Sequence, residues 1–498
     1  PEPRSETTAH KLYLFLMYAF ARLFIALLIA LRPVAAVPQS NFDDLPNLGD
    51  SSGQVISPQQ DRALGAYFMR QIRQSGIILE DDEATAYLAA LGRKLSIHSE
   101  NPGFNFTFFL VNDSSINAFA GPGGYIGANV GLFLASESES ELAGVMAHEI
   151  AHITQRHLAR AFDNQEKMSV PTMAAILAAI LLGATTDGSA GAAALMAAQA
   201  ASLQNQINFT RANEKEADRV GIQTLADAGF DPYGMPMFFE KLQKNSKLYG
   251  TRPPEFLSTH PVTLNRISEA TTRAESYPRV RDHDELDFKL IQAKLRANNY
   301  KNPKQVLADV QRYEGKSGGA SPVKQYEFGI LLSRTENHAE AQVVMEKLHR
   351  SDPDRIAYRL ALARTLTAAK DYDRALEVYA DTLELYPGEM TVVLPYATTL
   401  LSSGQSMEAY TLLNEVANRN PSNPKLHKLL AQAAGVTDHP VRTHTAMAQY
   451  YFLNGYTHQA IEQLKLAEKS PRLTHYQIAR IQARITDLEA LLELEKLE

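Results

Sequence analysis

The chain has 498 residues, more than one hydrophobic core usually serves, so its length predicts two or three domains. It contains no cysteine and no tryptophan, which excludes disulfide scaffolds, iron–sulfur clusters, thiolate zinc fingers and cysteine nucleophiles. The 49 basic and 56 acidic residues give a net charge of −7 without a basic block, so nothing in the composition supports nucleic-acid binding.

The N-terminal region has the pattern of an export signal. Residues 12–31 are apolar apart from Arg22, and the small residues Val34 and Ala36 follow them. We therefore expect residues 1–36 to be a cleaved signal peptide whose natural start is Met17. An uncleaved membrane anchor is the alternative, because about 20 apolar residues can span a bilayer. Residues 37–58 are rich in Pro, Ser, Asn, Asp and Gly and predict a flexible mature N-terminus.

Residues 59–282 have a mixed α/β pattern. Phe104–Val111 reads as a strand and Gly121–Gly124 as a turn. Residues 170–201 form two short stretches rich in Ala, Leu and Ile, each too short to span a bilayer. They predict two helices that are buried or cover a site. The alternative is a segment that makes peripheral contact with a membrane.

A metal-binding pattern lies at residues 148–152, which read HEIAH. Ser138 and Glu141 predict a capping box ahead of it, and the following apolar residues predict a helix. On a helix, positions i and i+4 share a face, so His148 and His152 can converge on one metal while Glu149 reaches a metal-bound water. Imidazole and carboxylate ligands suit one zinc ion. The alternative is a pair of core or solvated histidines.

A third ligand is needed to decide between these interpretations. A metzincin would need Gly at position 155 and His at position 158, where this chain has Gln155 and Leu158. His157, five residues past His152, is expected to point away from the metal and to lie on the surface or around the ligands. Residues 213–218 read NEKEAD in a second helical stretch. Glu214 and Asp218 share one face there, so Glu214 can bind the metal while Asp218 bonds a ring N–H of a ligating histidine. Glu216 faces elsewhere and is expected to be solvated.

From residue 283 to residue 498 the pattern is almost wholly helical and repeats every 34 residues. Residues 284–312 are expected to form a further, degenerate helical pair. An extra helix near 424–434 is expected to interrupt the array before Ala448 and Ala460 continue it. The period resembles the tetratricopeptide repeat, which would form a solenoid with a concave binding face; a generic helical bundle is the alternative. The recurring positions are Gly329, Ala363 and Ala397; Ala341, Ala375 and Ala409; and Pro353, Pro387 and Pro421.

The motifs taken together resemble the M48 family of zinc peptidases. The resemblance covers nearly the whole mature chain and implies an α+β, mostly helical, zincin-like metallopeptidase domain followed by an all-α tetratricopeptide-repeat solenoid. It implies that Glu149 and Asp218 are catalytic, the latter as an acid beside the metal ligands. The motifs that carry it are HEIAH at 148–152, NEKEAD at 213–218, NAFA at 117–120 with PGG at 122–124, and STHP at 258–261 with Arg266.

The same resemblance implies roles for the remaining residues. His148, His152 and Glu214 would bind zinc, and His260 would take its fourth position and hold the enzyme latent. Alternatively, His260 caps a helix opened by Pro261 or helps to stabilise the transition state. Arg266 would pair with a carboxylate near the site, although a structural salt bridge is equally plausible. Asn117 and Ala118 would bind the substrate backbone by β-addition, or are ordinary strand residues. The residues of the expected site are therefore His148, Glu149, His152, Glu214, Asp218, His260, Arg266, Asn117 and Ala118.

Signal peptide, peptidase domain and repeats in this order are similar to exported M48 proteases of the Gram-negative periplasm. That similarity implies an endopeptidase that degrades misassembled outer-membrane β-barrel proteins and assists their assembly. Its partners would be unfolded or misassembled outer-membrane proteins and, through the repeats, the barrel-assembly machinery. The alternative is mainly a chaperone or scaffold docking on that machinery, with a latent protease site.

Overall fold

The computed structural model describes residues 57–162, 211–248, 255–280, 285–313, 321–471 and 473–496, which all belong to one compact unit. The expected signal peptide at 1–36, nearly all of the segment 37–58 and the apolar stretch 170–201 lie outside these residues. Within the described residues, no helix combines the length and the apolar character that a membrane crossing requires.

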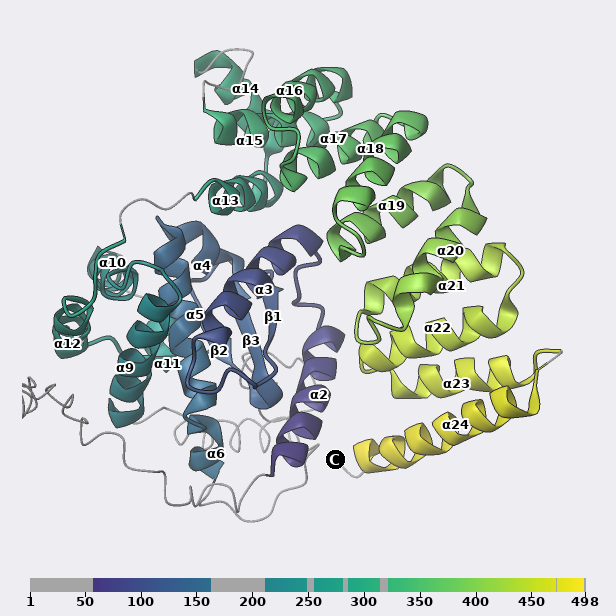
Figure 1. The fold of residues 1–498 in the computed structure, drawn as a ribbon, viewed down its shortest axis with the longest axis horizontal. Helices are drawn as coiled ribbons and strands as arrows, with labels where there is room; N and C mark the ends of the chain where they lie inside the picture. Colours follow the sequence, from purple (N-terminus) through teal and green to yellow (C-terminus); the bar gives the residue numbers. More distant parts are fainter. Residues whose placement is uncertain are drawn as a thin grey trace, which may run out of the picture. The chain divides into compact units, whose positions relative to one another are not determined.

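The first part of the chain builds a small sheet surrounded by helices (Figure 1). Its elements are α2 (Pro58–Gln74), α3 (Asp82–Ile97), β1 (Thr107–Val111), β2 (Ala118–Ala120), the 3₁₀ turn η2 (Pro122–Gly124), β3 (Tyr125–Asn129), α4 (Val130–Ala135), α5 (Glu139–Thr154), α6 (His157–Phe162), α9 (Arg211–Asp227), α10 (Gly234–Leu248), α11 (Glu255–Thr259) and α12 (Leu264–Ala274).

The sheet has the strand order β1-β3-β2, with β1 parallel and β2 antiparallel to β3. The expected strand at Phe104–Val111 begins only at Thr107, because Phe104 closes a turn by donating its N–H to the carbonyl of Asn101 (3.1 Å). The expected turn is present: Gly123 and Gly124 both have positive φ, which glycine adopts without strain. This turn returns the chain from β2 to β3 and leaves β2 at an edge.

Helix α5 crosses the centre of this part and is buried along nearly its whole length. The Ser138 side chain accepts the N–H of Glu141 (3.2 Å), which satisfies one donor at the helix start. The second hydrogen bond of the expected capping box differs. The Glu141 carboxylate accepts the N–H of Glu137 (2.6 Å), the residue before the N-cap, and not the N–H of Ser138. Helix α5 packs against β2 and α3 and also against α9 and α10. This packing holds the HEIAH segment rigidly in the core.

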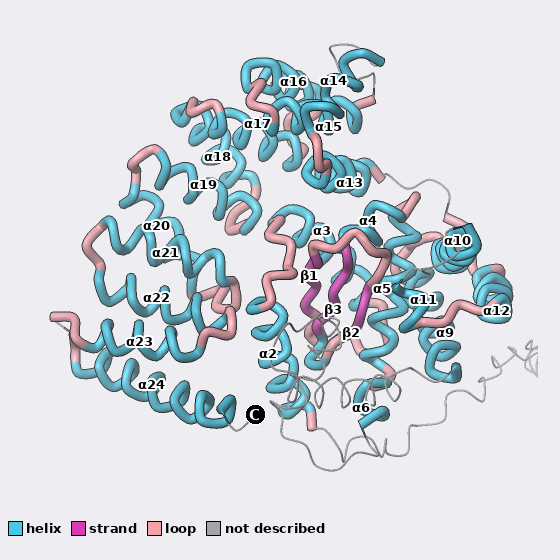
Figure 2. Tube along the Cα trace, turned by 180° about the vertical axis from the view of Figure 1, so that it is seen from behind, coloured by secondary structure: helices cyan, strands magenta, loops and turns pink. Residues whose placement is uncertain are grey.

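The second part of the chain is all α-helical (Figure 2). Its helices are α13 (Leu286–Asn299), α14 (Pro303–Tyr313), α15 (Pro322–Arg334), α16 (His338–Ser351), α17 (Ile356–Ala368), α18 (Tyr372–Leu385), α19 (Met390–Ser402), α20 (Ser406–Ala417), α21 (Pro424–Val436), α22 (Pro440–Leu453), α23 (Thr457–Glu468) and α24 (His475–Lys496). The fold class expected from the sequence, a mostly helical α+β domain followed by an all-α repeat, is confirmed.

The 34-residue period continues further than the sequence suggested. Helices start at Pro322, Ile356, Met390 and Pro424, each 34 residues after the one before. The helix expected near 424–434 therefore does not interrupt the array, because α21 is the first helix of a fourth pair. The small residues serve close packing: a Cβ at Gly329 would lie 2.5 Å from the terminal methyl of Met345.

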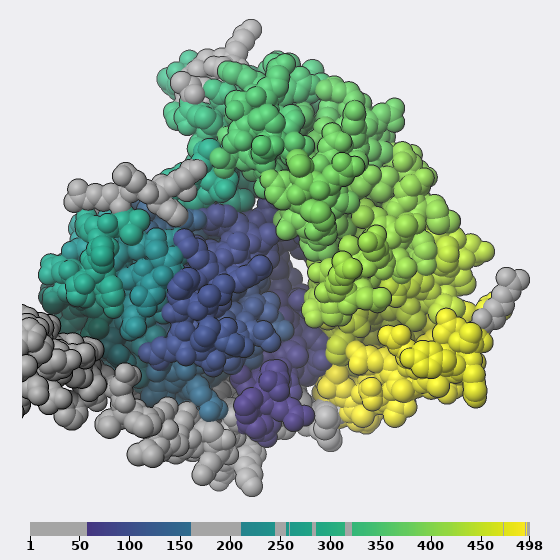
Figure 3. All heavy atoms as spheres, viewed as in Figure 1, coloured from purple at the N-terminus to yellow at the C-terminus, as the bar shows by residue number. Residues whose placement is uncertain are grey.

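The two parts share helix α13. One face of α13 places Phe288, Ile291 and Leu295 in the core around α5, while Leu290 and Ala293 belong to the core of α15–α17. A cleft of about 1030 Å³ separates α2, α3 and β1 from α19 and α21 (Figure 3). Ion pairs bridge the parts at the start of α3, where Lys294 contacts Asp81 (2.7 Å) and Glu83 (3.0 Å).

Candidate metal centre

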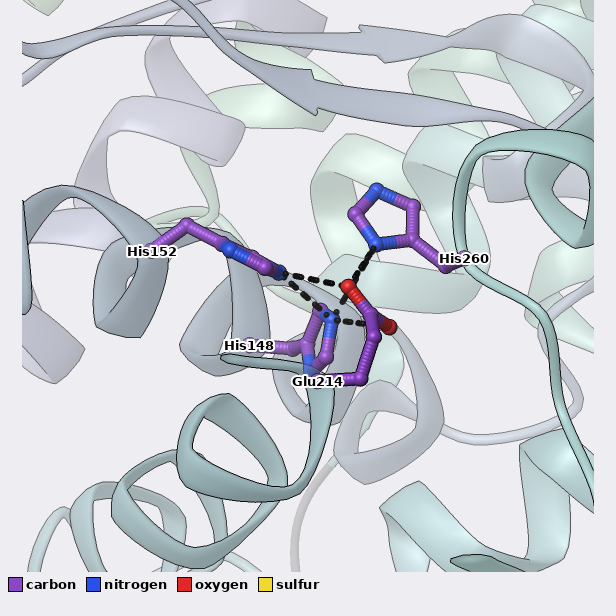
Figure 4. Close-up of side chains that lie close together, drawn as sticks. All are labelled: His148, His152, Glu214 and His260. Atoms are coloured by element: carbon purple, nitrogen blue, oxygen red, sulfur yellow. Dashed lines mark hydrogen bonds and ion pairs between the residues drawn. The ribbon is translucent and has the colours of Figure 1, made fainter. Parts of the chain in front are cut away.

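Four side chains from three helices meet in the core of the first part (Figure 4). His148 and His152 come from α5, Glu214 from α9 and His260 from the end of α11. One ligand atom of each lies within 4.8 Å of all the others, and all four residues are buried. His148 Nε2 lies 3.0 Å from His152 Nε2. Glu214 approaches the two histidine Nε2 atoms at 3.6 and 3.4 Å. The group has the size and the donors of a metal site.

His260 is the member that lies furthest away in the sequence. Its Nδ1 is 3.0 Å from Glu214 Oε1 and 3.4 Å from His148 Nε2. The ring stacks on Phe256, with centroids 4.7 Å apart, and Phe256 donates its N–H to the Ile116 carbonyl (3.2 Å). The short helix α11 is thereby attached to the residues just ahead of β2. His260 is thus held among the other three side chains by packing as well as by polar contacts.

Asp218 and Arg266 hold the ligand side chains from behind. Asp218 Oδ1 lies 3.1 Å from His148 Nδ1, the ring nitrogen that faces away from the group. Arg266, on α12, donates Nε and Nη2 to the two Asp218 oxygens (2.7 and 2.8 Å). Its Nη1 also pairs with Glu214 (2.7 Å). One guanidinium therefore fixes two carboxylates, each of which contacts a histidine, so the residues around the ligands set the orientation of the ligands.

The expectations for His157 and Glu216 are corrected by the structure. Helix α5 ends at Thr154, Arg156 takes a positive φ of 55°, and a new helix starts at His157. His157 Nδ1 then lies 2.7 Å from His152 Nδ1, and its Nε2 lies 3.0 Å from Glu216. His157 therefore lies around the ligands, one of its two expected positions, but it turns towards His152 and not away, because α5 does not continue through it. Glu216 is 31% exposed and only partly solvated, because it contacts His157 and Arg160. The break after Gln155 is not visible in the hydrophobic pattern.

Glu149 is fully buried beside this group. Its carboxylate oxygens make no side-chain hydrogen bond; their partners are the backbone of Ala120 and His260 Nε2, which lies at 3.6 Å. Burial raises the pKa of Glu149, while positive charge on His260 and His148 opposes the rise. A fully buried carboxyl with so few polar partners is costly to keep, so it points to a function rather than to stability.

Asn117 and Ala118 lie at the start of the edge strand β2 and are not among the four residues that could bind a metal. Both are buried, and the Asn117 carbonyl accepts the N–H of Asn129 on β3 (3.0 Å). Strand β2 packs against α5, so its backbone runs along the helix that carries Glu149. The other edge of β2 does not pair with a strand among the described residues.

The electrostatics of the group fit a bound cation. Burial alone would lower the pKa of His148, but its hydrogen bonds to Asp218 and Glu214 raise that pKa to about 9. Burial would raise the pKa of Glu214, but His260, His148 and His152 hold it far below its usual range. The buried carboxylates thus attract a proton onto the His148 imidazole, whereas burial lowers the pKa of His152. A metal ion would take over that positive charge and release the proton.

Comparison with known proteins gives matches over both parts. Residues 82–274 match the model of peptidase family M48, and residues 366–433 match a tetratricopeptide-repeat model. The chain is 35% identical to the Escherichia coli beta-barrel assembly-enhancing protease over 94% of this chain and 96% of that one. A putative beta-barrel assembly-enhancing protease of Vibrio cholerae is 34% identical, with the same coverage. The Arabidopsis mitochondrial metalloendopeptidase OMA1 is 33% identical over 32% of this chain and 30% of its own length.

Proposed function

Because the chain belongs to the M48 family of metalloendopeptidases, with tetratricopeptide repeats after the peptidase domain, we propose that it is a zinc-dependent protease of outer-membrane protein quality control. It would degrade misassembled β-barrel proteins and assist the assembly of others. The observation that carries the catalytic part is the buried group of His148, His152 and Glu214 with Glu149 beside it. The similarity to beta-barrel assembly-enhancing proteases supports the substrate class.

This proposal includes the organisation of the chain. Residues 1–36 would be the signal peptide, residues 59–282 the peptidase domain and residues 283–498 the repeat domain. Outer-membrane proteins of Gram-negative bacteria are β-barrels, and the periplasm is the compartment that they cross before insertion. A protease acting on them would work there. The lack of cysteine suits that oxidising compartment, because no thiol is open to unwanted disulfide formation.

For the chemistry, we assign zinc to His148, His152 and Glu214, whose neutral imidazoles and carboxylate suit that ion. A bound zinc ion would lower the pKa of a coordinated water to about 7 and polarise the substrate carbonyl. Glu149 would take the proton of the attacking water and later deliver it to the leaving amine. Its raised pKa makes the carboxylate a stronger base for the first transfer. Asp218 would keep His148 in the tautomer whose Nε2 faces the metal.

We assign substrate binding to the edge strand β2. Its start at Asn117 and Ala118 and its packing on α5 would let an extended peptide pair with its outer edge and pass Glu149. A peptide held by main-chain bonds is recognised as an extended strand rather than by one side chain. Such recognition would suit unfolded segments of β-barrel proteins, which are rich in potential strands.

A second function is favoured by the position of His260. Its Nδ1 lies within 3.0 Å of Glu214 and 3.4 Å of His148, so it can act as a fourth ligand. A fourth protein ligand would occupy the place that the catalytic water needs. The protein would then be latent at rest and act mainly as a chaperone or scaffold on the barrel-assembly machinery, cleaving only when α11 moves.

The replacement Glu149→Gln tests the protease role. We expect it to abolish cleavage of an unfolded outer-membrane protein while zinc content and folding stay unchanged, because the amide cannot accept the proton of the attacking water. Removal of the metal with a chelator should have the same effect on the wild type, and added zinc should restore cleavage. Full cleavage by the zinc-loaded Glu149→Gln protein would overturn the mechanism.

The replacement His260→Ala tests latency. If His260 blocks the fourth position, the variant cleaves the same substrate faster than the wild type, provided that both bind one zinc per chain. Leu257→Ala, on the same short helix, serves as the matched control. Equal or slower cleavage by His260→Ala would exclude the latent state and leave a supporting role for this histidine.

A further inference from the structure

A hollow of about 1160 Å³ lies among the last helices of the repeat, well away from the metal centre in sequence. Its walls come from α20, α22, α23 and α24, which Figure 2 shows stacked side by side. Three arginines line it: Arg442 on α22, and Arg480 and Arg484 on α24. Neither the proposed peptidase chemistry nor the fold of the repeat requires basic residues at this place.

The three guanidinium groups form no ion pair with the part of the chain that the structure describes. Among the described residues, no ion pair or side-chain hydrogen bond involves Arg442, Arg480 or Arg484, and Arg442 Nε is buried without a partner. Two carboxylates, Asp438 and Asp487, also line the hollow; Asp487 attracts Arg484, but neither carboxylate forms an ion pair with the three arginines. By contrast, the buried Arg266 pairs with two carboxylates. Arg442 and Arg484 are half-buried and Arg480 is exposed, so the hollow holds positive charge that is partly withdrawn from solvent without an ion pair, and an anionic ligand would supply that partner.

Aromatic packing holds Arg484 in place. Arg484 lies over the ring of Phe452 (4.5 Å), whose ring also meets Arg70 (4.8 Å). Burial lowers the pKa of Arg442, and the positive charge of nearby Arg480 adds to that effect. Side chains fixed in this way lose little conformational freedom when a ligand binds.

Apolar surface accompanies the charge. Phe452, Ile481 and Leu488 line the same hollow, and Tyr410 stacks on His439 at its rim, with ring centroids 4.2 Å apart. A small inorganic anion would use only the arginines and leave this surface open. A flat lipid surface could not enter a recess between helices. A peptide that carries both carboxylates and apolar side chains matches the volume, the charge and the apolar walls together.

We propose that this hollow binds an acidic segment of a partner protein, whose carboxylates contact Arg442, Arg480 and Arg484 while an apolar side chain packs against Phe452 and Ile481. The segment would dock independently of cleavage, because no residue of the hollow belongs to the metal centre. The hollow thereby gives the repeat a defined ligand chemistry, which the repeat pattern alone does not provide. Guanidinium–carboxylate contacts would set the affinity and make it sensitive to salt.

The test uses the full-length protein and two fluorescein-labelled peptides. One peptide alternates Asp with Phe and Leu, and its twin has Asn in place of each Asp. By fluorescence anisotropy we expect the acidic peptide to bind at least about tenfold more tightly, because charged hydrogen bonds are stronger than neutral ones. Arg442→Gln and Arg480→Gln should each weaken acidic-peptide binding by about fivefold or more, since each removes one such contact. Arg350→Gln, an exposed arginine on α16, is the control with the same charge change and should bind like the wild type.

Each outcome either supports or overturns the proposed peptide site. Selective loss in the two hollow variants, with unchanged cleavage of an unfolded substrate, supports the site and leaves the protease proposal unaffected. Equal binding of the two peptides overturns it, and so does equal loss in Arg350→Gln, which would mean general charge attraction. Displacement of the peptide by anionic lipid vesicles but not by unlabelled acidic peptide would also overturn it in favour of a membrane ligand. Circular dichroism checks folding; if one variant unfolds, the other variant and the wild-type comparison of the two peptides still decide.

Discussion

Arg266 connects the parts of the metal centre that lie on different helices. It reaches Asp218 through two nitrogens and Glu214 through the third. Without it, two buried carboxylates would face each other across His148, and their repulsion would spread the ligands. A lysine could supply the charge but not the forked geometry that holds both acids at once.

We predict that Arg266→Leu lowers zinc affinity by about 10- to 100-fold, the usual cost of losing a residue that orients metal ligands. Competition with a zinc-binding dye measures this directly. Arg273→Leu is the matched control, because Arg273 lies on the same helix with an exposed side chain. Unchanged affinity in Arg266→Leu would mean that the ion pairs only stabilise the fold.

His157 and Glu216 extend the same principle to the second histidine of the HEIAH segment. The contacts run from His152 Nδ1 to His157 Nδ1 and from His157 Nε2 to Glu216 (2.7 and 3.0 Å). If the final acceptor is the carboxylate, His157 carries its proton on Nε2 and accepts the proton of His152 on Nδ1. That arrangement leaves His152 Nε2 free of a proton and ready to bind a metal.

At the scale of elements, the position of α5 depends on glycines where helices approach closely. A Cβ on Gly144 would lie 2.9 Å from the backbone of Met235, at the start of α10. Such a contact cannot be relieved by rotating a side chain. The close approach also places α10 behind the HEIAH segment, where Phe239 meets the ring of His148 at 6.3 Å between centroids.

We predict that Gly144→Ala destabilises the protein. Alanine is favoured over glycine inside a helix by about 1 kcal/mol, but overpacking against backbone costs about 1–3 kcal/mol, so the clash outweighs the gain. Urea unfolding measures the difference. Gly103→Ala, in a turn where a Cβ would meet nothing within 4 Å, should change stability by less than about 0.5 kcal/mol. A more stable Gly144→Ala protein would contradict the packing argument.

At the scale of the whole molecule, the peptidase and repeat parts are joined by buried charge. Lys294 on the shared helix α13 contacts Asp81 and Glu83 at the start of α3, and Arg364 on α17 also pairs with Glu83. Lys425 on α21 pairs with Asp82 next to them. Four sequence regions therefore meet at one helix start, where negative charge is favoured by the helix dipole.

We predict that Lys294→Met destabilises the protein by about 3 kcal/mol at neutral pH, because it leaves the buried Asp81 without its ion pair, while Glu83 keeps Arg364. Chemical unfolding measures this, and Lys301→Met, with an exposed side chain nearby, is the control. A loss no larger than in Lys301→Met would mean that the ion pairs contribute little.

The same variant gives a pH dependence. Burial alone would raise the pKa of Asp81, but the charge and hydrogen bond of Lys294 hold it below its ordinary value of 3.8. A carboxyl with a lowered folded pKa contributes stability above the unfolded pKa and loses it as pH falls through the folded one. The stability difference between wild type and Lys294→Met should therefore be full at pH 7 and shrink below about pH 4. A difference that grows towards acid pH would contradict this assignment.

The sequence by itself determined the features that follow from local periodicity. The 3.6-residue turn of a helix places His148 and His152 on one face, and likewise Glu214 and Asp218, whatever surrounds them. The 34-residue period predicts stacked helix pairs. The fourth pair was missed because its residues match the repeat only in part: Ala431 keeps the small residue of its first helix, but Thr443 stands where its second helix would have alanine. Metal-ligand chemistry and repeat class were thus predictable.

Only the tertiary structure decided the contacts between distant segments. It brings His260 to ligands 112 and 46 residues away and joins Arg266 to both acids. It breaks α5 after Gln155 so that His157 turns back to His152, and it gathers three arginines of α22 and α24 around one hollow. The physical reason is that helix periodicity is encoded in neighbouring residues, whereas these contacts depend on how whole elements pack.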